Sequence, residues 1–248
     1  MTDTSATVRP DRRAELAAGL ARVRARIADA CTAAGRDRGE VTLVAVTKTY
    51  PAGDVVALAG LGVTDVGENR DQEAAPKAAE AAAAGATPRW HFIGQLQRNK
   101  CRSVVRYADV VQSVDSVRLA GALDAAAAAG RDRPLDVLVQ VSIDGDPARG
   151  GALPGSADPD RGLDPVAEAV AGAGALRLAG LMAVAPLGWE PERAFARLAE
   201  VTRRFRDGFP EATVLSAGMS GDLEIAIGYG ATHVRVGSAL LGMRPTLR

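Results

Sequence analysis

Residues 41–48 read VTLVAVTK, a nearly continuous apolar run that is rich in β-branched residues and ends on a lysine. Periodicity alone would also fit a buried helix segment, but the short length and the β-branching favour a strand buried on both faces of a parallel sheet. Pro51 follows closely and can open the next helix. Lys48 therefore falls at the carboxyl end of the first expected strand, where α/β folds bind their ligands. A lysine there can lose solvation and become a nucleophile or Schiff-base former, or it can simply face solvent.

The rest of the chain alternates between short apolar runs and helix-like segments. The expected later strands span 63–67, 90–93, 110–114, 135–143, 178–184, 213–217 and 234–237. Eight strands, each followed by a helix, predict a single (β/α)8 TIM barrel. An open doubly wound sheet is the alternative, but such sheets usually have fewer strands, and no GxGxxG follows the first strand. The amphipathic segment 11–34 predicts an extra N-terminal helix packed on the outside. The segment 95–107 predicts a helix after the third strand, and Pro76 should kink or divide the helix expected over 68–84.

These segments predict one barrel domain over residues 10–248, preceded by a flexible polar tail over residues 1–9. The segment 144–160 is rich in Gly, Pro and Asp. It is long for a loop in a compact domain, so it is a candidate lid or mobile segment.

Composition argues against several classes of protein. The formal net charge is +0 with no block of like charge, which disfavours a nucleic-acid-binding or membrane-surface protein. The two cysteines form no CxxC pair, as expected for reduced thiols in a cytoplasmic protein. His91 and His233 have no metal-ligating neighbours at the usual spacings. We therefore expect a cytoplasmic protein that binds no metal, nucleic acid or membrane.

The loops after the last two strands predict a phosphate site. Gly218 and Gly221 allow close approach of the backbone, and Ser220 between them offers a hydroxyl group. Gly237 and Ser238 offer a second amide and hydroxyl at another helix start. In (β/α)8 barrels this is a frequent place for a phosphate.

Two features of these loops allow other interpretations. Ser220 can equally be an ordinary N-cap of the following helix. Asp222 and Glu224 would lie in the first turn of that helix, where they would repel a phosphate unless they point away.

A lysine at one strand end and a phosphate site across the barrel mouth together suggest pyridoxal 5′-phosphate (PLP), bound to Lys48 as a Schiff base. Arg235 lies two residues before Gly237 on the same strand face, where it can face the pyridine nitrogen. Because an arginine cannot accept the ring proton, the pyridine would stay neutral and be a weaker electron sink. The alternative is an arginine of the barrel interior that pairs with a carboxylate, for which Glu68 is the candidate.

Six motifs, in order along the chain, resemble the pyridoxal phosphate homeostasis proteins, also called the proline synthetase co-transcribed homologue family. They are VAVTK (44–48), VGENR (66–70), WHFIGQLQRNK (90–100), GLMAVAP (180–186), GMSGD (218–222) and RVGSALLG (235–242). Ser238 is a mild departure, because the last motif of the family commonly has Thr there.

This resemblance implies a single barrel of the alanine racemase N-terminal type with PLP bound covalently to Lys48. It places the phosphate on Ser220 and on the turn at Gly237 and Ser238, with Arg235 near the pyridine nitrogen. It also implies that three further residues line the pocket, namely Asn69, His91 and Met182.

The resemblance further implies a carrier or buffer of PLP with no established catalytic turnover, which could pass PLP to apo PLP-dependent enzymes. An amino-acid racemase is the alternative, and a Schiff-base aldolase without a retained cofactor is a third hypothesis. A racemase of this barrel type needs a second base, typically a tyrosine supplied with an added β domain. Of Tyr50, Tyr107 and Tyr229, only Tyr50 closely follows a strand end. The absence of such a domain makes a monomer the expected state.

Overall fold

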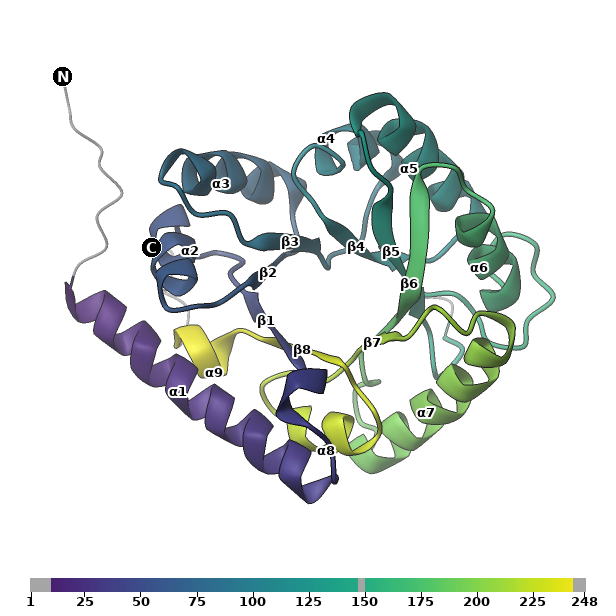
Figure 1. Ribbon diagram of the computed structural model, residues 1–248. Helices are drawn as coiled ribbons and strands as arrows, with labels where there is room; N and C mark the ends of the chain where they lie inside the picture. The colour runs from purple at the N-terminus through teal and green to yellow at the C-terminus, as the bar shows by residue number, and fades with distance from the viewer. Residues whose placement is uncertain (1–9, 147–149, 243–248) are drawn as a thin grey trace.

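The computed structural model describes residues 10–146 and 150–242 of the chain. Eight parallel strands close into a barrel in sequence order, and helices surround it (Figure 1). The strands are β1 (Thr42–Val46), β2 (Asp65–Glu68), β3 (Arg89–Phe92), β4 (Val110–Val114), β5 (Leu135–Val141), β6 (Leu176–Ala183), β7 (Val214–Ser216) and β8 (His233–Val236). The predicted (β/α)8 barrel is confirmed.

The helices cover the outside of the barrel. They are α1 (Pro10–Ala33), α2 (Ala52–Gly60), α3 (Asp71–Ala83), α4 (Cys101–Val104), α5 (Val117–Gly130), α6 (Leu163–Ala171), α7 (Pro191–Gly208), α8 (Leu223–Gly228) and α9 (Ser238–Leu241), with 3-10 turns at Arg38–Glu40 and Arg98–Lys100. Helix α1 is the extra N-terminal helix. Its buried stripe, formed by Leu16, Leu20, Val23 and Ile27, packs against α2, α8 and α9 (Figure 1).

Strand β1 closes the barrel because it pairs on both sides. Val44 lies opposite Asp65 of β2 and opposite Arg235 of β8. Val44 and Ala45 are fully buried, as expected for a strand that packs against helices outside the barrel and side chains inside it. The pairing brings the carboxyl end of β1 beside that of β8, so residues after the two strands share one end of the barrel.

Two expectations about helices are wrong. The helix predicted over 95–107 forms only the 3-10 turn Arg98–Lys100 and the short helix α4. Residues 95–97 alternate exposed, buried and exposed, with Leu96 in the core, as in extended chain, so the helical pattern starts later. Pro76 does not divide α3. It lies on the exposed face, where water can satisfy the carbonyl group that its missing N–H leaves without a donor.

The described part of the segment 144–160 is tied down in several places. The amide of Ala152 donates to the carbonyl of Gln140 at 2.7 Å, and the amide of Leu153 donates to the carbonyl of Arg161 at 2.7 Å. Residues 147–149 of this expected lid lie outside the described residues, as does the expected tail at 1–9. Among the described residues, no helix is both long and apolar enough to cross a membrane.

Candidate functional site

A cavity of about 280 Å³ opens at the carboxyl end of the barrel, beside β1, β7 and β8. Six of the nine predicted site residues line it together: Lys48, Ser220, Gly221, Arg235, Gly237 and Ser238. The cavity is also lined by Val46, Tyr50, Ile93, Met219 and Gly242. Lys48 and Ser238, which are 190 positions apart in the sequence, therefore belong to one site, at the end of the barrel where the sequence places it.

Lys48 lies in a turn that helix α3 holds on both sides. The Nζ atom of Lys77 donates to the carbonyl of Thr47 at 2.8 Å, and the amide of Thr49 donates to a carboxylate oxygen of Glu73. Thr49 has a φ of 71°, the one positive φ outside glycine among the described residues. A threonine in this region costs conformational energy and persists where the surroundings enforce it. These two contacts from Lys77 and Glu73, which we call the α3 clamp, therefore fix the backbone of the half-buried Lys48.

The clamp depends on a buried ion cluster beneath the turn. Lys77 is only 5% exposed and contacts Glu68 at 2.7 Å and Glu73 at 2.9 Å. Glu68 is fully buried, and its Oε1 atom also accepts a hydrogen bond from Thr47 at 2.7 Å. Burial raises the pKa of Glu68, and Lys77 opposes that shift. The proposed pairing of Glu68 with Arg235 is therefore wrong, because Glu68 pairs with Lys77.

Glu73 and Lys77 are absent from the predicted site, although a signal for their pairing exists. They are four residues apart on one helix, the spacing at which a glutamate and a lysine meet. That spacing predicts their mutual contact, but not that they reach the turn around Lys48.

The chain contains three lysines, Lys48, Lys77 and Lys100. Lys77 is buried in the ion cluster, and Lys100 lies 3.7 Å from Asp71. Lys48 is the one lysine that lines the carboxyl-end cavity. Lys48 is therefore the lysine whose amine can react with a ligand in this cavity.

The loop between β7 and α8 needs a glycine at its first turn. Gly218 has a φ of 89°, and a Cβ atom there would lie 2.6 Å from the Cβ of Ala226. At Gly221 a Cβ atom would meet nothing within 4 Å, because that glycine faces open space. The two glycines therefore serve different purposes: Gly218 shapes the loop, and Gly221 leaves room beside the cavity.

Ser220 is not a helix cap. Asp222 occupies the N-cap position of α8, and its side chain accepts a hydrogen bond from the amide of Met219 at 2.6 Å. The hydroxyl of Ser220 lies 3.3 Å from the hydroxyl of Ser238 and 3.4 Å from the amide of Ala239. The hydroxyl groups that follow β7 and β8 therefore converge on one point at the edge of the cavity.

The acidic residues that could repel an anion here have other partners. Glu224 pairs with Arg26 of α1 at 2.6 Å, and that contact holds the pKa of Glu224 below its usual value. Arg26 also donates to the carbonyl of Ser220 at 3.0 Å. Because α8 and α9 have only six and four residues, we assign the capacity for an anion to individual N–H and O–H groups rather than to helix dipoles.

Arg235 is a buried cation at the floor of the cavity. It is 5% exposed, and it donates to the Oγ of Ser216 at 2.8 Å and to the carbonyl of Ala183 at 2.9 Å. Burial lowers the pKa of Arg235 to about 10, with Asp222 opposing the shift, so the group stays charged at neutral pH. Among the described residues no carboxylate forms an ion pair with it. A buried cation without an anion is costly, which favours an electron-rich or anionic ligand in the cavity.

Three predicted residues do not line this cavity. His91 is 1% exposed and is held between Asp65 and Gln112. Met182 is 2% exposed and packs with Val110 and Leu138 in the barrel interior. Asn69 is partly buried after β2 and is not a lining residue.

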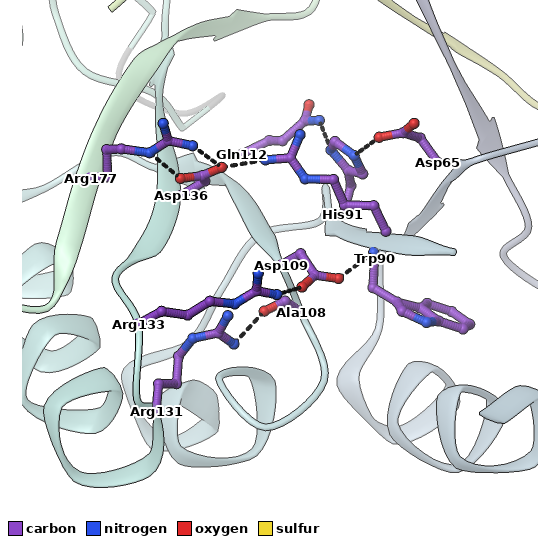
Figure 2. A network of polar contacts seen from close by, with 11 residues as sticks. Asp65, Trp90, His91, Ala108, Asp109, Gln112, Arg131, Arg133, Asp136 and Arg177 are labelled. Atoms are coloured by element: carbon purple, nitrogen blue, oxygen red, sulfur yellow. Dashed lines mark hydrogen bonds and ion pairs between the residues drawn. The ribbon is translucent and has the colours of Figure 1, made fainter. Parts of the chain in front are cut away.

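A second hollow lies at the opposite, amino end of the strands. One part, of about 470 Å³, is lined by Arg89, Arg131, Arg133 and Arg177 among others, and an adjoining part of about 340 Å³ reaches His91 and His233. Asp136 pairs with Arg89 and Arg177, and Asp109 pairs with Arg133 at 2.9 Å (Figure 2). These ion pairs lie where strands begin, the end of such barrels that usually serves stability.

The chain matches the family model of the alanine racemase N-terminal domain over residues 19–245. It is 47% identical over 247 residues to a pyridoxal phosphate homeostasis protein of Mycobacterium leprae (strain TN), with 94% of each chain covered. A protein of the same name from Escherichia coli (strain K12) is 38% identical, over 93% of this chain and 97% of that one. Among solved structures, PipY of Synechococcus elongatus PCC7942, with PLP bound, is similar with a TM-score of 0.72 and 32% identity, over 92% of this chain and 100% of that one.

Proposed function

The chain belongs to the family of pyridoxal phosphate homeostasis proteins, and we propose that it binds PLP in the carboxyl-end cavity and carries it without turning over a substrate. One observation carries this proposal. The one lysine that lines the cavity shares it with two converging hydroxyl groups and with a buried arginine that has no carboxylate partner among the described residues. These are the groups that an aldehyde, a phosphate and a ring nitrogen require, so the residues present fit PLP.

Each group has a separate task in this proposal. When bound, PLP supplies an aldehyde that condenses reversibly with an amine. Lys48 provides that amine, and the clamp from α3 holds its backbone in place. The hydroxyls of Ser220 and Ser238, with the amides near Gly221 and Gly237, hold the phosphate. Arg235 donates toward the ring nitrogen and, because it has no acceptor, leaves that nitrogen without a proton.

The lack of a suitable second base supports a carrier rather than a racemase. The hydroxyl of Tyr50, which lines the cavity, donates to the carbonyl of Gly242 at 2.8 Å. Burial raises the pKa of Tyr107, and Tyr107 does not line the cavity. Tyr229 is 38% exposed and also lies outside the cavity lining. No tyrosine is thus poised to exchange a proton with a substrate held at Lys48.

We further propose that the protein acts in the cytoplasm as a monomer that releases PLP to apo PLP-dependent enzymes. Asn69, His91 and Met182 stay predicted pocket residues, although they are not among the side chains that line the cavity.

A transfer assay tests the carrier function. Protein loaded with PLP is mixed with an apo-aminotransferase, and recovery of its activity is compared with recovery from the same amount of free PLP. The carrier function predicts full recovery from the loaded protein and no racemisation of alanine or serine by the protein alone. Sustained racemisation would instead establish the racemase alternative.

A further inference from the structure

A continuous run of hydrogen bonds crosses the barrel interior beneath the carboxyl-end cavity. Asp65 bonds to the Nε2 atom of His91 at 2.8 Å, and the Nδ1 atom of His91 bonds to Gln112 at 2.7 Å (Figure 2). Gln112 then bonds to Ser216 at 2.7 Å, and Ser216 bonds to Arg235 at 2.8 Å. All five residues are at most 6% exposed. The run thus joins the buried arginine of the cavity to His91, which lines the hollow at the other end.

The chemistry of the two ends fixes every hydrogen in the run. Arginine can only donate, so the Oγ atom of Ser216 accepts from Arg235 and gives its own hydrogen to the Oε1 atom of Gln112. The amide nitrogen of Gln112 must then donate to the Nδ1 atom of His91. That leaves the hydrogen of His91 on Nε2, where it donates to the carboxylate of Asp65.

We propose that Ser216, Gln112 and His91 are positioning residues for Arg235, and that the run places the hydrogen of His91 on Nε2 with Nδ1 as an acceptor. The positioning of Arg235 toward a bound ring rests on the function proposed above. The position of the hydrogen on the His91 ring does not depend on that function. The family motif that contains His91 thus reaches the cofactor cavity indirectly, through three other side chains.

The geometry explains why the arginine needs this support. Its Nη1 and Nη2 atoms are tied to Ser216 and Ala183, so the plane of the guanidinium is set by two fixed acceptors. The hydroxyl of Ser216 in turn bonds to both Arg235 and Gln112. Removing the hydroxyl leaves Arg235 with the carbonyl of Ala183 as its hydrogen-bond partner among the described residues, so the guanidinium can rotate about that contact.

The first arm of the test uses the protein without PLP. The chain has two histidines, so ¹⁵N-histidine NMR with a His233→Gln variant assigns His91 directly. We expect the hydrogen of His91 on Nε2, which faces Asp65, and none on Nδ1, which faces Gln112. In Gln112→Glu a carboxylate faces Nδ1, so His91 should carry hydrogens on both nitrogens. A wild-type His91 that carries a hydrogen on Nδ1 would overturn the proposed run.

The second arm measures PLP binding. We expect Ser216→Ala to raise the Kd for PLP by about 10- to 100-fold and to shift the pH at which the bound chromophore changes colour. Ser216→Thr keeps the hydroxyl and should restore both values. Ser113→Ala is the matched control, since Ser113 is 2% exposed and its hydroxyl has no partner. Circular dichroism verifies that each variant folds.

This arm separates failure of the positioning role from failure of the proposed function. If folded Ser216→Ala binds PLP like Ser113→Ala, with an unchanged pH profile, the positioning role is refuted while PLP binding stands. If the wild-type protein binds no PLP, the proposed function fails, and the NMR arm alone decides whether the run exists as described.

Discussion

Replacing Lys77 by methionine should strongly destabilise the fold, although Lys77 touches no ligand. The substitution keeps an unbranched side chain but removes the ammonium group that contacts Glu68, Glu73 and the carbonyl of Thr47. Glu68 is fully buried, and its Oε2 atom already has no hydrogen-bond partner. Without Lys77, a buried carboxylate would keep only the hydroxyl of Thr47. Breaking a buried pair on one side typically costs about 3–5 kcal/mol, and we expect a loss in that range.

The cost should depend on pH. Burial raises the pKa of Glu68 above the usual value of a glutamate, and Lys77 is the main group that opposes the shift. A carboxyl with a higher pKa in the folded than in the unfolded state loses folding free energy as the pH rises above the unfolded value. The deficit of Lys77→Met should therefore be larger at pH 8 than at pH 5.

Urea unfolding followed by circular dichroism measures these free energies. The double variant Glu68→Gln/Lys77→Met removes the stranded carboxylate, so it should recover most of the loss. Lys100→Met is the matched control, because Lys100 is 32% exposed and 3.7 Å from its carboxylate, and it should cost less than about 1 kcal/mol. A loss below about 1 kcal/mol for Lys77→Met, or strictly additive effects in the double variant, would refute the reasoning.

Three further predictions concern the loops and the second histidine. Ser220→Ala should weaken PLP binding by about 1–3 kcal/mol in a fluorescence titration; an unchanged Kd would remove Ser220 from the phosphate site. Gly218→Ala should lower the free energy of unfolding by more than about 1 kcal/mol, because its Cβ would lie 2.6 Å from that of Ala226, while Gly221→Ala should be nearly neutral in the protein without PLP. Equal losses at the two glycines would contradict the different roles given to them. Burial lowers the pKa of His233 to about 4, so its NMR titration should have a midpoint near that value, and folding stability should fall as the pH drops from 6.5 toward 4. A midpoint at the ordinary 6.5 would show that the surroundings of the half-buried His233 do not disfavour its charged form.

The strands of the barrel were predictable because buried parallel strands leave continuous apolar runs. VTLVAVTK marks β1, and the run at 110–114 coincides with β4. The helix after β3 was not predictable, because residues 95–97 carry helix-compatible side chains in an extended segment. Periodicity over so short a stretch does not separate the two states.

The carboxyl-end site was partly predictable for a related reason. Residues that directly follow strands, such as Lys48 and Ser220, must lie at that end. His91 and Ile93 are two residues apart and share the interior face of the barrel, yet only Ile93 lines the cavity. Side chains inside a barrel form layers, and the sequence does not tell which layer a residue occupies. The clamp by Glu73 and Lys77 was hidden because it depends on how α3 packs against the turn.

The central claim is that PLP attaches to Lys48, and peptide mapping after borohydride reduction tests it most directly. Reduction converts the linkage to a stable secondary amine, and the chain offers only three lysines as sites. We predict a pyridoxyl group on the peptide that contains Lys48, and none on the peptides that contain Lys77 or Lys100. A modification on either of the other lysines, or an adduct that persists in Lys48→Ala, would contradict the account.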